Sequence, residues 1–151
     1  MNSFAAKRID DLAALVLSGY VLKKDSPSCG VERVRVYESK TQPARRGRGL
    51  FAAALMKKLP LLPVEEEGRL NDPSLRENFI ERVFAYHRWR AEEAAKSRGG
   101  LVAFHTGHKF LLLAHSELHY RQLGRVVASV KQKSLREVYD EYGCGFMDSL
   151  R

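Results

Sequence analysis

Apolar and polar positions follow different patterns in the two halves of the chain. Over residues 1–67, short segments with apolar residues at helical spacing alternate with short segments rich in β-branched and aromatic residues. This pattern predicts, in chain order, a helix over residues 4–17, strands over 20–23 and 31–37, a helix over 50–59 and a short strand over 61–64. Such an order is typical of an α/β fold, so residues 1–67 are expected to form a partial α/β layer.

Several residues of this first part are suited to begin or end the predicted elements. Ser3 is a good N-cap for the first helix, and Gly19 lies where a C-cap glycine is expected. The segment 41–49, which is rich in Pro, Gly and Arg, is expected to be a loop. Pro60 should end the second helix, and the acidic residues 65–67 should mark the exit from the sheet.

From Asp72 onward the pattern is helical throughout. Asp72 followed by Pro73 is typical of a helix start, because Asp accepts backbone N–H bonds and Pro suits the first turn. The predicted helices run to about Ser97, from 101 to 130 and from 134 to 142, with a break at Gly99-Gly100. The inner side of the first of them is expected to carry Phe79, Ile80, Val83, Phe84 and His87. We therefore expect a partial α/β domain over residues 1–70 and an all-α segment of the helical-hairpin type over 71–151.

Composition is compatible with a soluble protein and leaves the class of partner open. The chain has 26 Lys and Arg against 18 Asp and Glu, a net charge of +8 that is spread evenly. Such a surface permits nucleic acid as a partner without requiring it. No apolar run approaches the roughly 18 residues of a membrane span. The two cysteines, Cys29 and Cys144, do not suggest a disulfide framework, so a reducing cytoplasm is the expected compartment.

Cys29 lies in a polar loop that follows the strand predicted over 20–23. The loop residues Ser26, Pro27, Ser28 and Gly30 are turn formers or restrict the backbone. In open α/β sheets, ligands bind at the carboxyl ends of the strands, where this loop is expected. The residues alone leave two interpretations open: a structural thiol that packs like a small hydrophobe, or a ligand-binding thiol.

Arg45, Arg46 and Arg48 precede a predicted helix N-terminus, which is a place where anions bind. The segment lacks the spaced Gly-Lys-Ser/Thr of a phosphate-binding P-loop. An anion site and a solvated basic loop are therefore both compatible with the sequence.

Four histidines lie within the helix predicted over 101–130, namely His105, His108, His115 and His119. On a continuous helix they share an arc of about 80°, so they could bind a metal ion. Leu112, Leu123 and Val126 share that arc, and the alternative is therefore a core face with hydrogen-bonded histidines that face residues 79–87.

A mixture of basic and aromatic residues occurs in the preceding helix, where Arg82, Arg88 and Arg90 accompany Tyr86 and Trp89. Such a mixture can stack on and neutralise a nucleic acid. Helical phase scatters these residues around the helix, which favours core aromatics with solvated arginines.

Two segments of the chain resemble known bacterial families. The run Leu22-Lys-Lys-Asp-Ser-Pro-Ser-Cys-Gly30 is similar to the signature of a domain whose characterised members are thiouracil desulfidases. The similarity continues through residues 31–37, 45–54 and 61–67. Residues 79–87, 104–110 and 115–124 resemble the YbgA-like family, and the two kinds of domain often occur fused in this order.

The resemblance implies a 4Fe–4S cluster with one open iron that takes sulfur from a thiolated pyrimidine. It implies that Cys29 is a metal and cofactor ligand with Gly30 beside it, and that Ser26 and Ser28 have catalytic roles by hydrogen bonding to sulfur or substrate. It gives Cys144 no cluster role. A small thiolated base would be the partner, in the cytoplasm and without a membrane.

The family supplies three cysteines to the cluster, and two of them precede the matching motif. Met1 aligns with the interior of the desulfidase-like domain, and the YbgA-like part covers about half of its family. We therefore expect a truncated chain that holds no cluster and is inactive alone, although the intact protein could be an enzyme. The alternative is a non-enzymatic module that binds nucleic acid or protein through its basic helical half.

Overall fold

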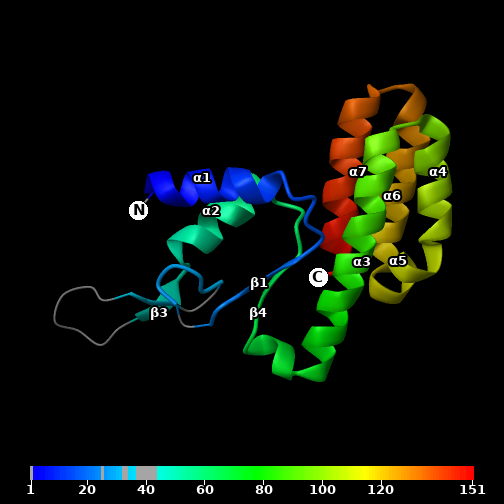
Figure 1. The fold of residues 1–151 in the computed structure, drawn as a ribbon. Helices are drawn as coiled ribbons and strands as arrows, with labels where there is room; N and C mark the ends of the chain where they lie inside the picture. Colours follow the sequence, from blue (N-terminus) through cyan, green and yellow to red (C-terminus); the bar gives the residue numbers. More distant parts are fainter. Residues whose placement is uncertain (1, 25, 32–33, 37–43) are drawn as a thin grey trace. The chain divides into compact units, whose positions relative to one another are not determined.

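The structure is a computed structural model that describes residues 2–24, 26–31, 34–36 and 44–151. The chain forms two compact units, Met1–Val83 and Phe84–Arg151. The long helix α3 (Pro73–Ala95) begins in the first unit and ends in the second (Figure 1). A partial α/β segment followed by helices confirms the predicted fold class. The units divide within α3, whereas the sequence pattern changes near residue 70.

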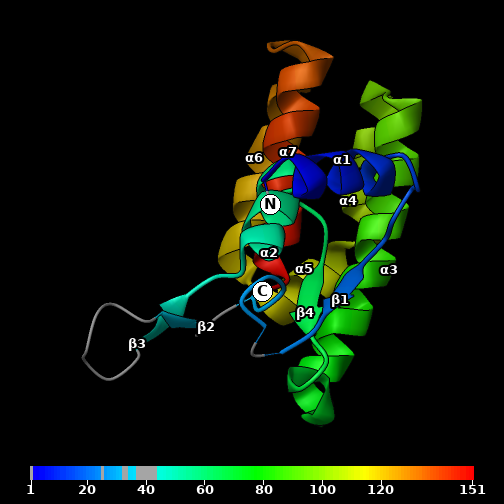
Figure 2. The ribbon, with the colours of Figure 1, turned by 60° about the vertical axis from the view of Figure 1, so that its left-hand side comes forward.

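The first unit combines helices with two pairs of short strands. Its elements before α3 are α1 (Asn2–Ala13), β1 (Tyr20–Leu22), β2 (Val34–Val36), β3 (Ala44–Gly47), α2 (Leu50–Lys58), β4 (Val64–Glu66) and the 3-10 helix η1 (Arg69–Asn71). Strands β1 and β4 pair in parallel, with Leu22 opposite Glu66, and lie side by side in Figures 1 and 2. Strands β2 and β3 pair antiparallel.

Helices α1 and α2 pack on each other through small and aliphatic side chains. Ile9 and Leu12 of α1 are buried, as are Ala52 and Leu55 of α2. This contact forms the apolar core beside the parallel strand pair. Ile9 and Leu12 are separated by one turn of helix, as are Ala52 and Leu55, so each pair lies on one face of its helix.

The boundaries of α1 differ from the prediction. Ser3 lies inside the helix, not at its N-cap, and the helix ends at Ala13, so Val16 is 69% exposed. Gly19 is not a C-cap; a Cβ there would lie 2.6 Å from Cγ2 of Val83, so close approach explains the glycine.

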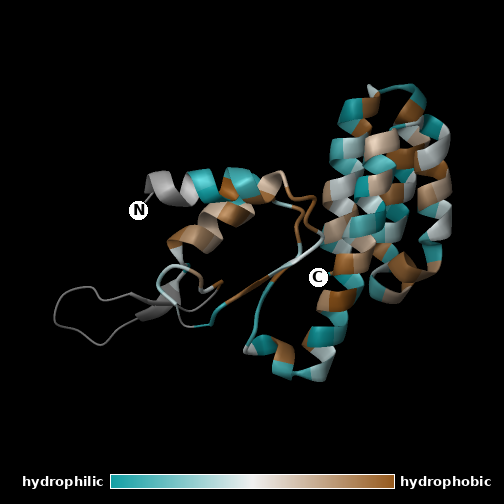
Figure 3. Ribbon diagram, in the orientation of Figure 1, coloured by the Kyte–Doolittle hydropathy of each residue, from teal (hydrophilic) through white to brown (hydrophobic). Residues whose placement is uncertain are grey.

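Three further predictions for the first unit were wrong. The segment 41–49 is not a loop throughout, because Ala44–Gly47 pairs with β2. The strand predicted over 61–64 lies further on, at Val64–Glu66. The acidic residues were expected to leave the sheet, yet Glu65 and Glu66 belong to β4 and are 7% and 5% exposed. The hydrophilic end of β4 is visible in Figure 3.

Short helices form the second unit together with the end of α3. They are α4 (Arg98–Gly107), α5 (Lys109–His115), α6 (Glu117–Ala128), the 3-10 helix η2 (Ser129–Lys131) and α7 (Leu135–Ser149). The single helix predicted over 101–130 is therefore interrupted at His108 and at Ser116. Ser116 ends α5 and caps α6, because its hydroxyl accepts a bond from the backbone N–H of His119.

The other helix ends are also set by local capping. The predicted break at Gly99-Gly100 lies earlier, at Lys96 with φ 29° and at Ser97, which caps α4. Helix α7 extends beyond the predicted end at Tyr142, and Ser134 begins it with a reciprocal capping box to Glu137.

Trp89 of α3 is the centre of the core of the second unit. Its ring is 5.3 Å from that of Phe104 and 5.4 Å from that of Tyr142, centroid to centroid, and it is 1% exposed. The predicted inner side of α3 was partly wrong, because Phe84 is 60% exposed while Trp89 is buried.

None of the described helices is both long enough and apolar enough to cross a membrane.

Candidate functional site

The loop that carries Cys29 leaves β1 at the carboxyl end of the parallel strand pair. Strand β4 ends at the same side, because the two strands are parallel and Leu22 lies opposite Glu66. The backbone N–H of Glu67 donates to the carbonyl oxygen of Leu22 at 3.0 Å and extends the pairing by one step. The cysteine loop and the acidic residues after β4 therefore lie at one edge of the sheet, where ligands bind in α/β folds.

Ser26 closes the turn that presents Cys29. Its hydroxyl oxygen accepts bonds from the backbone N–H groups of Ser28, at 3.3 Å, and of Cys29, at 3.2 Å. The backbone N–H of Gly30 donates to the carbonyl oxygen of Ser26 at 2.8 Å. A short hydroxyl side chain that bonds its own following backbone stabilises such a turn.

The same turn also caps helix α2, which has no side-chain cap. The carbonyl oxygen of Ser28 accepts bonds from the N–H groups of Phe51, at 2.9 Å, and Ala52, at 3.2 Å. The N–H of Gly49 donates to the carbonyl oxygen of Gly30 at 2.8 Å. The first N–H groups of a helix lack partners within the helix, so the cysteine turn satisfies groups that would otherwise need water.

Carboxylates of the acidic segment bind the backbone at both ends of the cysteine loop. Oε2 of Glu67 accepts a 2.6 Å bond from the N–H of Lys24, before the turn. Oε1 of Glu66 accepts a 2.6 Å bond from the N–H of Val31, after it. Nε of Arg48 donates to the carbonyl oxygen of Val31 at 3.0 Å. The loop is thus held from strand β4, from helix α2 and by its own turn.

The third glutamate of the segment, Glu65, bonds residues that follow it in the chain. Oε1 of Glu65 accepts bonds from Nε of Arg69, at 2.8 Å, and from the N–H of Glu66, at 3.0 Å. The sequence did not indicate that Glu66 and Glu67 are partners of the loop. The one indication in the sequence is that these glutamates directly follow the apolar residues 61–64. Parallel strands usually carry apolar residues, so charged residues at this place are unusual.

Cys29 is half-buried, and both Cys29 and Cys144 are free thiols. Among the residues that the structure describes, no group of three His, Cys, Asp or Glu side chains is arranged to hold a metal ion. Cys144 lies exposed on α7 in the second unit. A 4Fe–4S cluster is held mostly by cysteine thiolates, so these residues do not fit a whole cluster, and Cys29 offers one ligand. The roles predicted for Ser26, Ser28, Cys29 and Gly30 stay predictions.

The four histidines do not share one helix face, because the chain between them is interrupted. His105 belongs to α4, His108 lies between α4 and α5, His115 ends α5 and His119 belongs to α6. His115 is exposed, and Nδ1 of His119 lies 2.8 Å from Oγ of Ser116. The arc calculated for a continuous helix was therefore wrong.

His105 and His108 take part in the aromatic core of the second unit. Nδ1 of His105 lies 3.1 Å from the hydroxyl of Tyr142, and the ring stacks on Tyr120 with 5.0 Å between centroids. Nδ1 of His108 lies 2.8 Å from the carbonyl oxygen of Phe104, and Nε of Arg88 donates to its Nε2 at 2.9 Å. This arrangement requires a neutral imidazole with its proton on Nδ1. Burial lowers the pKa of both histidines, and the Arg88 charge lowers that of His108 further.

The arginines that the sequence analysis singled out lie in different surroundings. Arg45 and Arg46 belong to β3, and their side chains lie outside the described part of the structure. Arg48 bonds the backbone of the cysteine loop. The guanidinium of Arg90 lies 5.9 Å from the ring centre of Tyr86, and Trp89 is fully buried, so Trp89 does not offer its face to a nucleic acid.

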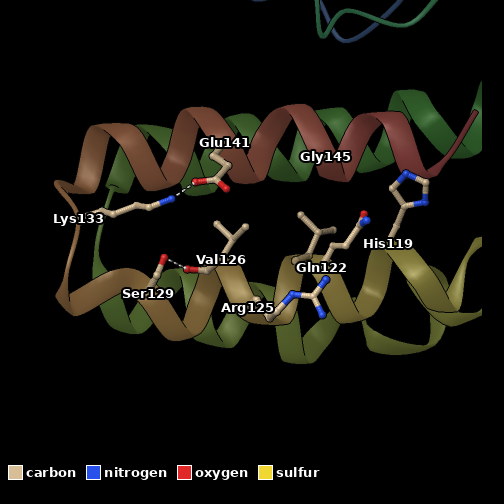
Figure 4. Close-up of a pocket in the computed structure, with 9 residues that line it drawn as sticks. His119, Gln122, Arg125, Val126, Ser129, Lys133, Glu141 and Gly145 are labelled. Carbon is tan, nitrogen blue, oxygen red and sulfur yellow. Dashed lines mark hydrogen bonds and ion pairs between the residues drawn. The ribbon is translucent and has the colours of Figure 1, made fainter.

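A groove between α6 and α7 in the second unit has a volume of about 460 Å³ (Figure 4). Leu123 and Gly145 contribute to its apolar part. At one end Nζ of Lys133 pairs with Oε2 of Glu141 at 2.6 Å, and His119 lies toward the other. This groove could not be predicted from the sequence, because its residues come from α6, η2, the turn before α7 and α7 itself, which meet only in the folded unit.

Comparisons with known proteins agree with the two-part organisation. Residues 1–67 match the family described as 2-thiouracil desulfurase, and residues 109–151 match a family described as protein of unknown function (DUF1722). The chain therefore combines a thiouracil desulfurase-like segment with a DUF1722-like segment, which confirms the resemblance drawn from the sequence motifs.

One curated relative is the "Uncharacterized protein YbgA" of Escherichia coli (strain K12). It is 40% identical over 63 residues, which cover 40% of this chain and 37% of the relative. The chain thus spans little more than a third of the length of this relative. No solved structure matches the chain.

Proposed function

We propose that the first unit belongs to an iron–sulfur-dependent desulfidase that removes sulfur from thiolated pyrimidines, with Cys29 as one ligand of the cluster. The observation that carries this proposal is the position of Cys29: a half-buried thiol in a turn held on three sides at the carboxyl edge of a parallel strand pair. The match of residues 1–67 to the 2-thiouracil desulfurase family supplies the reaction class.

Each loop residue has a task in this proposal. Cys29 supplies a thiolate at a fixed place. Ser26 accepts two backbone bonds through its oxygen, so its hydroxyl proton stays available to a sulfur or substrate atom. Ser28 uses its carbonyl oxygen to cap α2, which leaves its hydroxyl for the same purpose. The backbone of Gly30 completes the turn.

The 151 residues by themselves are proposed to be inactive on thiouracil. One thiolate does not hold a 4Fe–4S cluster, and the other cysteine of the sequence lies on α7 of the second unit. The remaining thiolates would have to come from polypeptide outside these residues. Two free thiols suit a reducing compartment, and we propose the cytoplasm.

Anaerobic reconstitution with iron and sulfide tests the proposal. The 151-residue chain should bind substoichiometric iron and remain colourless. A longer chain that carries two further cysteines ahead of residue 1 should become brown, hold a stoichiometric cluster and release sulfide from thiouracil. In that longer chain Cys29→Ser should lose most of the iron, and the matched control Cys144→Ser should retain it. A stoichiometric cluster on the short chain, or unchanged iron in Cys29→Ser, would contradict the proposal.

Binding of nucleic acid or another protein through the basic helical half is the competing function. A salt-dependent complex with RNA or DNA, formed by a longer chain that contains no iron, is the result that would replace the desulfidase proposal. Trp89 and Tyr86, the two aromatic residues that motivated it, are both buried, at 1% and 9% exposed.

A further inference from the structure

We propose that Glu66 is a positioning residue that fixes the cysteine loop, and through it the place of the Cys29 sulfur. The proposal deepens the function proposed above, on which it rests for its consequence at iron. Its starting point is a bond across 35 positions of sequence: Oε1 of Glu66, the last residue of β4, accepts from the backbone N–H of Val31 at 2.6 Å.

The burial of this carboxylate needs a reason. Glu66 is 5% exposed, and placing a carboxylate out of water costs several kcal/mol unless hydrogen bonds or opposite charges compensate it. A parallel strand at this point would ordinarily carry an apolar residue, which would have no such cost. The backbone N–H of Val31 is also buried, and without an acceptor it would carry a penalty of its own.

The chemistry of the bond explains why a carboxylate suits the position. A charged acceptor forms shorter and stronger bonds to an N–H than a neutral one does, and 2.6 Å is a short separation for N–H to O. Val31 follows Cys29 by two residues, and Gly30 between them is itself buried. Few backbone torsions therefore separate the fixed N–H from the thiol.

Glu67 offers a natural comparison within the same segment. Its Oε2 accepts an equally short bond, 2.6 Å, from the N–H of Lys24 at the other end of the loop. This bond is exposed, so water can replace it at little cost, whereas the Glu66 bond is buried. The structure therefore assigns the positioning role to Glu66 and makes Glu67 the matched control.

The consequence concerns a metal ligand. Bond lengths between a metal and its ligands are held within about 0.2 Å. A thiolate whose position varies with the conformation of its loop is therefore a poor ligand. Supporting residues that fix a ligand contribute to affinity without touching the metal. Glu66 would act in this way through the backbone of Val31.

The first test uses the reactivity of the Cys29 thiol in the 151-residue chain, with Cys144→Ser as background. Loss of a charged hydrogen bond loosens the loop, so Glu66→Ala should speed modification by 5,5′-dithiobis(2-nitrobenzoate) about tenfold or more. Glu66→Gln keeps an acceptor and should restore most of the protection, and Glu67→Ala should change the rate little. A Glu66→Ala rate equal to that of the parent chain, with unchanged circular dichroism, would overturn the proposal.

The second test stays informative if Glu66→Ala fails to fold. In Glu66→Gln, the amide proton resonance of Val31 should move upfield because its acceptor loses charge, and that of Lys24 should not move. Glu67→Gln should give the reverse pattern. An amide proton chemical shift of Val31 that stays the same in Glu66→Gln would overturn the proposal. Neither test involves iron. A longer chain with the two further cysteines that never acquires a cluster would therefore contradict the proposed function and leave this inference standing.

Discussion

Gly49, at the start of α2, lies against the backbone of Ser28 in the cysteine turn. A Cβ at position 49 would collide with the carbonyl group of Ser28 and would lie 2.7 Å from the backbone nitrogen of Cys29. The backbone of Gly49 is extended, with φ −61° and ψ 141°, so the glycine is required for space and not for its torsion angles. The turn that presents Cys29 and the helix that it caps therefore depend on a missing side chain.

Gly49→Ala should destabilise the first unit and loosen the cysteine turn. The neighbouring atoms are backbone, which cannot rotate away, so we expect a loss of about 1–3 kcal/mol, as for overpacking in a core. Denaturant unfolding followed by circular dichroism, together with the rate of Cys29 modification, measures both effects. Gly99→Ala is the control, because a Cβ there meets nothing within 4 Å. Equal stability of the two variants would show that the close approach has been misjudged.

Gly143→Ala should destabilise the second unit for a similar reason. A Cβ at Gly143 would lie 2.7 Å from Cζ2 and from Nε1 of Trp89, and that ring is enclosed by other aromatic rings. We expect a loss of about 1–3 kcal/mol. Trp89 is the single tryptophan of the chain, so its fluorescence reports the unfolding of this unit. Gly107→Ala, in open space, is the control and should leave the unfolding midpoint almost unchanged.

Features with a local cause could be predicted from the sequence. Oδ1 of Asp72 accepts bonds from the N–H groups of Ser74 and Leu75, so the predicted N-cap of α3 is confirmed. Helix α2 begins at Leu50, as expected, and ends just before Pro60. The cysteine loop follows β1 as the turn formers indicated. In each case a few neighbouring residues determine the backbone.

Features that depend on distant partners could not be predicted. The burial of Glu66 follows from a bond to Val31, which lies 35 positions earlier, and nothing near Glu66 in the sequence indicates that partner. The need for Gly49 follows from Ser28 in the same way. Helical period alone suggested one helix over 101–130, because the pattern of apolar residues continues across the interruptions at His108 and Ser116.

Tyr139→Phe should weaken the junction between α3, α4 and α7. The hydroxyl of Tyr139 lies 2.6 Å from Oε1 of Glu92 and accepts a 2.9 Å bond from the N–H of Ser97, the N-cap of α4. Burial and the bond to Glu92 raise the pKa of Tyr139 to about 12. Removal of the hydroxyl breaks both bonds, one of them to a carboxylate, and should cost about 1–3 kcal/mol.

Fluorescence of Trp89 during urea unfolding measures this loss. Tyr120→Phe is the matched control, because the described contacts of Tyr120 include its stacking on His105, which the phenylalanine ring retains. Tyr139→Phe should lower the unfolding midpoint and Tyr120→Phe should leave it nearly unchanged. Equal midpoints for the two variants would show that the bonds of Tyr139 contribute no net stability.

The second unit should lose stability as the pH falls below the pKa of a free histidine. Burial lowers the pKa of His105 and of His108 in the folded unit, while an unfolded histidine titrates near 6.5. Below about pH 6.5 the unfolded chain therefore binds more protons than the folded one, and the free energy of unfolding decreases as the pH falls. At His108 the protonated ring could no longer accept the bond from Nε of Arg88 and would place two positive charges side by side.

Urea unfolding of the second unit, followed by Trp89 fluorescence at about pH 7.5 and about pH 5.5, measures this dependence. The range should stay above about pH 5, because the pKa of Glu137 is lowered from 4.5 by its bonds to Ser134 and would add a dependence of the same sign at lower pH. We expect a lower midpoint at the lower pH for the parent chain. Replacing both histidines, His105→Gln with His108→Gln, should flatten the dependence, because the groups that take up the protons are gone. An equally steep dependence in that double variant would assign the protons to other groups and contradict the neutral state inferred for these two histidines.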